Sequence, residues 1–180
     1  GAGAGAGTGR GETPTFLFVA GKFTCRDSAM LSDFDSETYG FSSTAVTILD
    51  CSNNSLRKLT KEVLSQFKNL HTVILHNNPE LRVENNAFSG LPNLTTIDLS
   101  DCGLRELPDD CFANCPQLQR LVLKGNRLNT LPASLAACKR LQELDLAENA
   151  FTQLPNLQPL HALETLDLTN NQLTTLPPDR

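Results

Sequence analysis

A repeated sequence frame constrains the fold of this chain more than any other feature. Units with the pattern L-x-x-L-x-L-x-x-N-x-L-x-x-L begin at Val46, Leu70, Leu94, Leu118, Leu141 and Leu163. Their first residues are 24, 24, 24, 23 and 22 positions apart. A near-constant period in this range indicates stacked structural repeats, because one unit alone cannot bury its apolar residues.

Each unit is predicted to hold one short strand and one return segment. The L-x-L core has an apolar residue at every second position, which gives a strand with one apolar face. The rest of the unit is long enough to bring the next strand back in parallel beside the first. We therefore predict an α/β solenoid with a parallel concave β-sheet, short helical or irregular convex returns, an N-terminal cap and no C-terminal cap.

One polar position follows the strand in every unit, where the chain turns inside the coil. A side chain with both a donor and an acceptor can satisfy buried backbone groups there. The third unit has a cysteine at this position, and a thiol is small, tolerates burial and donates weakly. We predict a structural ladder formed by Asn54, Asn78, Cys102, Asn126, Asn149 and Asn171.

These units resemble the leucine-rich repeat family, over residues 46–180. The length of 24 residues, together with Phe88 and Phe112 in the returns, resembles the repeats of extracellular receptors and secreted recognition proteins. At a narrower level the chain resembles arthropod Toll-like ectodomains and mosquito leucine-rich immune proteins, since a non-standard cap leads into the repeats. The resemblance implies a non-enzymatic, extracellular module (secreted or ectodomain) for protein-protein recognition, with an innate immune or receptor role as the finer expectation.

Two other functions remain open at this point. An intracellular scaffold or enzyme regulator is the main alternative, because the units at Leu118 and Leu141 have the shorter length typical of intracellular repeats. All cysteines would then be free. A hydrolase with an appended repeat array would need a catalytic domain that the sequence does not show.

Three segments are expected. The glycine-rich residues 1–12 are predicted to be a linker or tag. Residues 13–45 form the cap, with two short strands in FLFV and FTC and then a polar loop or short helix, and residues 46–180 hold the six repeats, the last one incomplete. Since the chain stops at LTTLPPDR and terminal repeats normally carry a polar cap, we expect a fragment of a longer protein that self-associates through its C-terminal edge, residues 163–180.

The six cysteines divide into two groups. Extracellular members of the family commonly bridge their N-terminal cap, so the resemblance implies a disulfide between Cys25, which lies outside the repeat register, and Cys51. The Cys111-x3-Cys115 spacing invites a zinc site, but the frame directs both residues into a leucine-lined interior, so we predict no metal. Two sequons predict glycosylation at Asn53 and Asn93, consistent with secretion.

Composition and motifs exclude several function classes. Fifteen Lys and Arg against twenty Asp and Glu give a net charge of −5, which argues against nucleic-acid binding. No apolar run has the length of a membrane span, so no membrane insertion is expected. The three histidines are predicted to be on the surface without a nucleophile beside them, and no glycine-rich phosphate loop follows a strand. We predict no catalytic residue and no cofactor.

The outward side chains of the concave sheet are the remaining candidates for function. The period places apolar residues on this exposed face in the N-terminal part, at Ile48, Ile74 and Val122, whereas the C-terminal part is acidic. Strand propensity and ordinary surface charge are the alternative explanation. We predict that a protein ligand binds the concave face at Ile74, His76, Asp98, Arg120, Val122 and Lys124.

Overall fold

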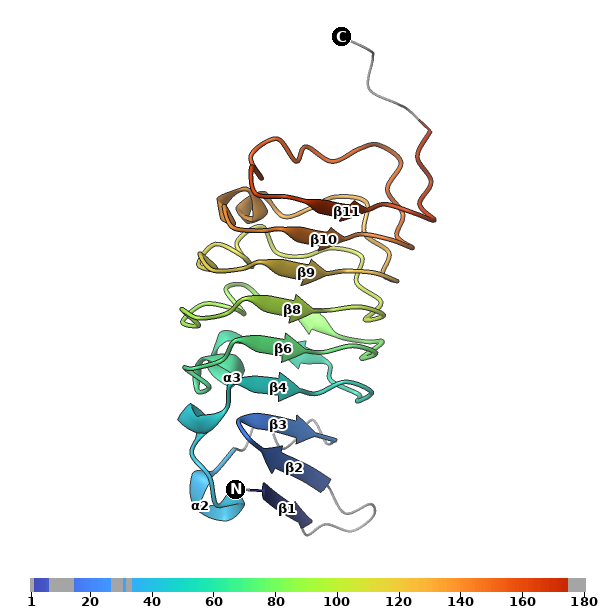
Figure 1. Cartoon of the computed structure of the whole chain (residues 1–180). Coiled ribbons are helices and arrows are strands. Elements are labelled where there is room, and N and C mark those ends of the chain that lie inside the picture. Colours follow the sequence, from blue (N-terminus) through green and yellow to red (C-terminus); the bar gives the residue numbers. More distant parts are fainter. Residues whose placement is uncertain (1, 7–14, 27–30, 32–33, 175–180) are drawn as a thin grey trace.

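The computed structural model describes residues 2–6, 15–26, 31 and 34–174. Its strands lie one above another in a single stack, with β1 at one end and β11 at the other (Figure 1). Nine strands form one sheet in the order β1-β2-β3-β4-β6-β8-β9-β10-β11, and every pair from β3 onward is parallel. This is the predicted solenoid.

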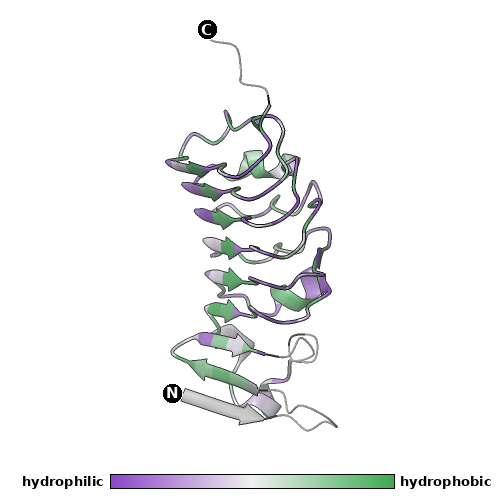
Figure 2. Ribbon diagram, turned by 90° about the vertical axis from the view of Figure 1, so that its right-hand side faces the viewer, coloured by the Kyte–Doolittle hydropathy of each residue, from purple (hydrophilic) through white to green (hydrophobic). Residues whose placement is uncertain are grey.

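Each repeat contributes one three-residue strand, located where the L-x-L core predicts it. If the strand continued, the leucine after the ladder position would point away from the core, because it lies an odd number of residues beyond the last leucine of the L-x-L core. The strands are β4 (Ile48–Asp50), β6 (Thr72–Ile74), β8 (Thr96–Asp98), β9 (Arg120–Val122), β10 (Glu143–Asp145) and β11 (Thr165–Asp167). Figure 2 shows these strands along one side of the stack and the returns along the other.

The returns contain little regular structure. The first has β5 (Lys58–Leu59) and α3 (Lys61–Ser65), which begins after Thr60, whose hydroxyl accepts the N–H of Val63. β5 pairs in parallel with β7 (Arg82–Val83) of the second return. The 3₁₀ helix η2 (Ala133–Ala137) lies in the fourth return. The prediction of short helical or irregular returns is confirmed.

The cap consists of strands and short helices packed around aromatic rings. β2 (Thr15–Val19) and β3 (Lys22–Cys25) form a hairpin at the predicted FLFV and FTC segments. α2 (Ser36–Tyr39) and the 3₁₀ helix η1 (Ser43–Ala45) follow before the first repeat. Seven rings form a connected cluster that covers the end of the repeat core: Phe16, Phe18, Phe23, Phe34, Tyr39, Phe41 and Phe67.

One strand lies within the segment predicted to be a linker. β1 (Ala2–Ala6) pairs antiparallel with β2 over five residues, so that Ala4 lies opposite Leu17. The sequence pattern did not indicate this strand, because alanine and glycine both have low strand propensity. The structure therefore extends the sheet by one strand beyond the predicted cap.

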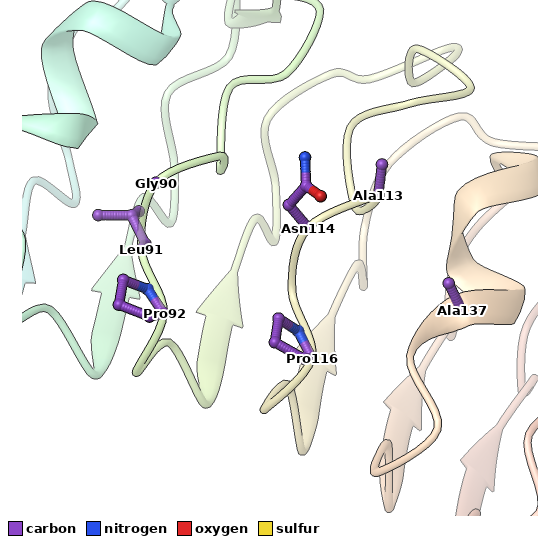
Figure 3. A pocket seen from close by; sticks show the side chains of 7 residues that line it. All are labelled: Gly90, Leu91, Pro92, Ala113, Asn114, Pro116 and Ala137. Atoms are coloured by element: carbon purple, nitrogen blue, oxygen red, sulfur yellow. The ribbon is translucent and has the colours of Figure 1, made fainter.

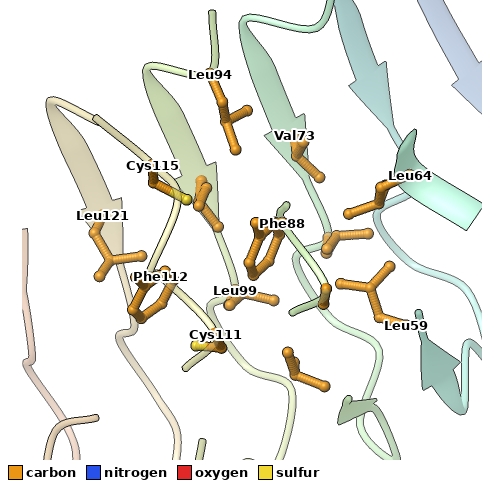
Figure 4. Packing of buried hydrophobic residues seen from close by; sticks show 14 of the residues in the cluster. Leu59, Leu64, Val73, Phe88, Leu94, Leu99, Cys111, Phe112, Cys115 and Leu121 are labelled. Atoms are coloured by element: carbon orange, nitrogen blue, oxygen red, sulfur yellow. The ribbon is translucent and has the colours of Figure 1, made fainter. Parts of the chain in front are cut away.

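The core is a continuous column of leucines and phenylalanines between the sheet and the returns (Figure 4). Phe88 and Phe112 stack on each other across two repeats, with ring centroids 5.8 Å apart. Cys111, Cys115 and Cys138 fill apolar positions in the same column. The repeats thus stabilise one another through neighbour contacts, as expected for a solenoid.

The predicted ladder residues donate hydrogen bonds to backbone carbonyls in every repeat. Asn126 shows the standard arrangement: its Nδ2 donates to the carbonyls of Leu99 and Leu123 at 2.9 Å, and its Oδ1 accepts the N–H of Leu104 at 3.0 Å. Asn54, Asn78, Asn149 and Asn171 also donate to the carbonyl of their own strand and of the preceding one. The ladder connects consecutive repeats through backbone groups that water cannot reach.

Cys102 occupies the ladder position of the third repeat with a different hydrogen-bond pattern. Its Sγ donates to the Leu75 carbonyl at 3.1 Å, but a thiol offers no equivalent of the amide oxygen. The preceding repeat does not need that acceptor, because its loop contains one extra residue and Leu81 donates its N–H to the Asn78 carbonyl. A β-carbon on Gly103 would lie 2.4 Å from the Pro79 carbonyl of this loop. The cysteine and glycine therefore fit the irregular loop that they cover.

Candidate protein-binding face

The strand register defines two rows of outward side chains on the concave face, the side of the main sheet away from the core. The first row is Ile48, Thr72, Thr96, Arg120, Glu143 and Thr165, and the second is Asp50, Ile74, Asp98, Val122, Asp145 and Asp167. These are the positions that the repeat period predicts. The repeat frame positions them because the alternate side chains of each strand are buried.

The strand register also extends the concave face into the cap, which the repeat period did not predict. Across β2, β3 and β4, the first row continues through Val19, Lys22 and Ile48. The second row continues through Leu17, Thr24 and Asp50. The cap strands therefore add two aliphatic side chains, Leu17 at 47% exposure and Val19 at 41%. The continuous apolar run Phe16, Leu17, Phe18 and Val19 was the sequence signal for a strand with apolar side chains on both faces.

The structure brings the six predicted binding residues onto three adjacent strands, β6, β8 and β9, or directly after them. Arg120 and Lys124 are exposed, and Ile74, His76 and Asp98 are half-buried. Val122 is the exception: only 7% of its surface is exposed, so the prediction of an accessible apolar side chain is wrong there. Val122 lies between Asp98 and Asp145 in register and outside the continuous core cluster.

The aspartates of the second row are held by their own strands. Each carboxylate accepts, through Oδ1, the backbone N–H two residues further along, at 2.9–3.0 Å for Asp50, Asp98, Asp145 and Asp167. The repeated D-x-S, D-x-A and D-x-T sequences are the signal for this turn. One carboxylate oxygen at each site thus has a structural role. The pKa of Asp167 is lowered by hydrogen bonds from the Thr169 hydroxyl and N–H, with a smaller contribution from Lys124.

His76 belongs to a hydrogen-bonded cluster on this face. Its Nδ1 lies 2.8 Å from the Ser100 hydroxyl, which donates to Asp98 at 2.6 Å, and 3.5 Å from a carboxylate oxygen of Asp101. Since the Ser100 proton is directed at Asp98, the hydroxyl accepts from Nδ1–H. This serine is therefore not positioned as a nucleophile with His76 as its base. The cluster fixes the orientation of the imidazole on the concave face.

Two ion pairs cross the face. Lys22 and Asp50 are 3.7 Å apart between the cap and the first repeat, and Arg120 donates to Glu143 at 3.0 Å between the fourth and fifth repeats. Both cationic side chains are half-exposed or more. Exposed pairs of this kind contribute little to stability, so their charges are available to a partner.

The cysteines lie inside the structure. Cys25 ends β3 and Cys51 directly follows the neighbouring strand β4, and a hydrogen bond with the Cys25 thiol, followed by burial, raises the pKa of Cys51 well above its ordinary value. Burial raises the pKa of Cys102 and of Cys138 to about 11. Within residues 2–6, 15–26, 31 and 34–174, no group of three or more histidine, cysteine or acidic side chains is arranged to hold a metal ion.

One hollow lies on the return side, away from the concave face. It has a volume of about 380 Å³ and lies across three consecutive returns, where Pro92 and Pro116 occupy equivalent positions in neighbouring repeats, as do Ala113 and Ala137 (Figure 3). None of its lining residues is charged. It has the chemistry of a shallow apolar contact and not of a reaction site.

Comparison with known proteins identifies the family. A model described as "Leucine rich repeat" matches residues 44–104 and 92–151, and one for "Leucine Rich repeats (2 copies)" matches residues 139–178. The chain belongs to the leucine-rich repeat family. Among the described helices, none is long and apolar enough to cross a membrane.

Individual relatives support the extracellular resemblance. Human podocan-like protein 1 is 31% identical over 140 residues, which cover 74% of this chain and 27% of that protein. Toll-like receptor 7 of Drosophila melanogaster is 35% identical over 98 residues, 49% of this chain and 7% of the receptor. The structure of the leucine-rich repeat protein LIC12759 of Leptospira interrogans aligns with a TM-score of 0.73 and 29% identity, covering 87% of this chain and 38% of that one. This repeat array therefore spans a minor part of the proteins it matches.

Proposed function

We propose that this leucine-rich repeat array binds a protein ligand through its concave face, with the contact centred on the N-terminal half. The observation that supports this most is a group of four aliphatic side chains, with Lys22, Thr24 and Asp50 among them, on a sheet surface whose opposite side already forms the core. Leu17 and Val19 are exposed, and Ile48 and Ile74 are half-buried on the same surface. The fold does not require apolar residues there, and exposed apolar side chains among polar and charged ones are typical of a protein interface.

The binding surface combines this apolar part with charged residues further along the stack. The proposed contact residues remain Ile74, His76, Asp98, Arg120 and Lys124, joined by the cap residues Leu17 and Val19. Because Val122 is covered, it does not serve as an anchor. Beyond Lys124 the face is acidic, at Glu143, Asp145, Glu148, Glu164 and Asp167. A partner with an apolar centre and a basic margin is complementary to this distribution.

The proposed location is extracellular, in a secreted protein or an ectodomain. Its support is the likeness to podocan-like protein 1 and other extracellular leucine-rich repeat proteins, together with the exposure of Asn53 and Asn93, the two sequon asparagines. The adjacency of Cys25 and Cys51 agrees with a disulfide between them. A receptor or innate immune role is supported by the likeness to Toll-like receptor 7.

Self-association through the C-terminal edge stays a second, weaker proposal. Leu166 and Leu173 are 39% and 36% exposed at this edge. Leu176, also within the predicted C-terminal edge, lies outside the described residues. An exposed apolar edge beside a strand favours association.

The concave-face proposal is tested by substitutions that change the surface without changing the core. Ile74→Asp would place a third carboxylate between Asp50 and Asp98, so Ile74→Thr is the cleaner variant, since it keeps the branched shape that strands prefer. Loss of an apolar side chain from an interface centre costs about 2 kcal/mol, so we expect Ile74→Thr to weaken binding about tenfold or more. Lys139→Glu on a return is the control.

The measurement is the dissociation constant of the partner protein by surface plasmon resonance, with thermal unfolding to verify each variant. Unchanged affinity of the Ile74 variants together with a loss for Lys139→Glu would place the binding surface on the returns and refute the proposal.

A further inference from the structure

The outer strand of the cap has an unusual composition for a position near the edge of a sheet. β2 reads TFLFV, with no charge and high strand propensity throughout. Phe16 and Phe18 pack into the cap, whereas Leu17 and Val19 are exposed on the concave side, and Figure 2 colours β2 as hydrophobic. Proteins usually protect such an edge with charges, proline or a bulge, because it can pair with another chain.

β1 covers this edge through backbone pairing. It lies antiparallel to β2, and its five residues are alanine and glycine, both depleted in strands. Glycine in a strand interior weakens pairing further because of its large loss of conformational freedom on folding. The β2 edge therefore accepts an antiparallel strand, and its present occupant is one that a strand with better propensity can replace.

We propose that β2 is a homodimerisation strand: β2 of a second copy of this chain replaces β1 and pairs antiparallel about a two-fold axis at Leu17. The sequence is self-complementary in this register. Leu17 lies opposite its own copy, Phe16 opposite Phe18 and Thr15 opposite Val19. The aromatic residues of both copies stay on the core side and the aliphatic residues on the concave side, and such cross-strand pairs stabilise sheets. The contact is isologous, so it closes at two copies.

Charge favours this edge over the opposite end of the solenoid. The same arrangement at β11, centred on Leu166, would place the Asp167 carboxylates of the two copies diagonally across the junction on the same face. Like charges across paired strands are destabilising. β2 contains no charged residue, so two copies meet without repulsion. The dimer would join two concave faces into one continuous sheet.

The test changes the competition between β1 and the second copy. All proteins carry Leu166→Lys, which closes the C-terminal edge to association. The double variant Ala4→Pro/Gly5→Pro weakens the pairing of β1 with β2. Successive N–H groups of a strand point to alternate sides, so one of the two prolines removes an N–H group that donates to β2. β1 of the same chain competes with the second copy for the β2 edge at a high effective concentration. Once β1 is weakened, we expect the proline variant to dimerise about tenfold more tightly than the protein with intact β1, as measured by sedimentation velocity.

A third substitution locates the contact. Adding Leu17→Lys places two ammonium groups at the axis and should return the proline variant to a monomer, whereas Thr72→Lys, on the same face three strands away, should leave the dimer intact. Circular dichroism verifies folding, and the single Ala4→Pro and Gly5→Pro variants repeat the test with a smaller perturbation. A proline variant that stays monomeric over the concentration range, or a dimer that survives Leu17→Lys, would overturn the proposal.

Discussion

Replacement of Asn126 by leucine is the perturbation that tests the ladder most sharply. Its amide group connects four buried backbone groups: the carbonyls of Leu99 and Leu123, each 2.9 Å from Nδ2, and the N–H groups of Cys102 and Leu104, each 3.0 Å from Oδ1. A buried polar group that loses its partner costs about 1–3 kcal/mol. The four together give a loss of about 4 kcal/mol or more, a large part of the stability of an ordinary domain, about 5–15 kcal/mol.

The same substitution at Cys102 gives a graded comparison. Its sulfur has a single proton, which it directs at the Leu75 carbonyl at 3.1 Å or the Ser100 carbonyl at 3.4 Å. Cys102→Leu therefore leaves fewer and weaker bonds unmade, and we expect a loss of about 1–2 kcal/mol. Asn129→Leu makes the same chemical change on the surface and should alter stability by no more than about 0.5 kcal/mol.

Urea unfolding followed by circular dichroism measures all three variants. The expected order of destabilisation is Asn126→Leu, then Cys102→Leu, then Asn129→Leu. Equal losses for the two ladder variants would show that the hydrogen bonds do not set the cost, and that the volume of the new side chain does.

Three further outcomes are expected. If Cys25 and Cys51 are bridged, four thiols will be titrated in the denatured, unreduced protein, and reduction of the disulfide will lower the free energy of unfolding by about 3.5 kcal/mol for a loop of this length. Six titratable thiols would support the intracellular alternative. Because burial raises the pKa of Cys102 and Cys138 from 9.0 to about 11, unfolded thiols lose protons before folded ones, so the free energy of unfolding should fall from pH 9 to pH 11. A Cys138→Ala variant should show a smaller fall, and an identical one would refute the thiol explanation. Phe112→Ala removes a ring stacked on Phe88 and should cost about 3–5 kcal/mol in urea unfolding; a cost near that of an exposed site would show that the column repacks.

The sequence predicted the repeats well because each residue of the frame meets the same neighbours in every turn. The apolar positions, the ladder and the outward rows follow from the period alone, and the structure has all of them. Cys102 is informative in this respect: the sequence indicated that a thiol could replace the amide, but the reason lies in the extra residue of the preceding loop, which the frame does not show.

The cap and the accessibility of single side chains could not be predicted in the same way. Leu17 and Val19 lie outside the repeat period, so only the register of β2 and β3 with β4 places them on the concave face. Val122 points outward as predicted and is still covered, because exposure depends on the side chains around it and not on the direction of its own strand. Neighbour packing is a three-dimensional property that the sequence period does not contain.

The central claim is that a protein partner contacts the concave face, and site-specific photo-crosslinking tests it before the partner has been identified. A photoreactive amino acid is placed at Thr72 on the concave face and, in a separate protein, at Lys139 on a return, and each is irradiated in an extract of the cells that produce the protein. We predict one dominant covalent adduct from position 72, lost when Ile74→Thr is added, and none from position 139. The same adduct from position 139, with none from position 72, would contradict the account.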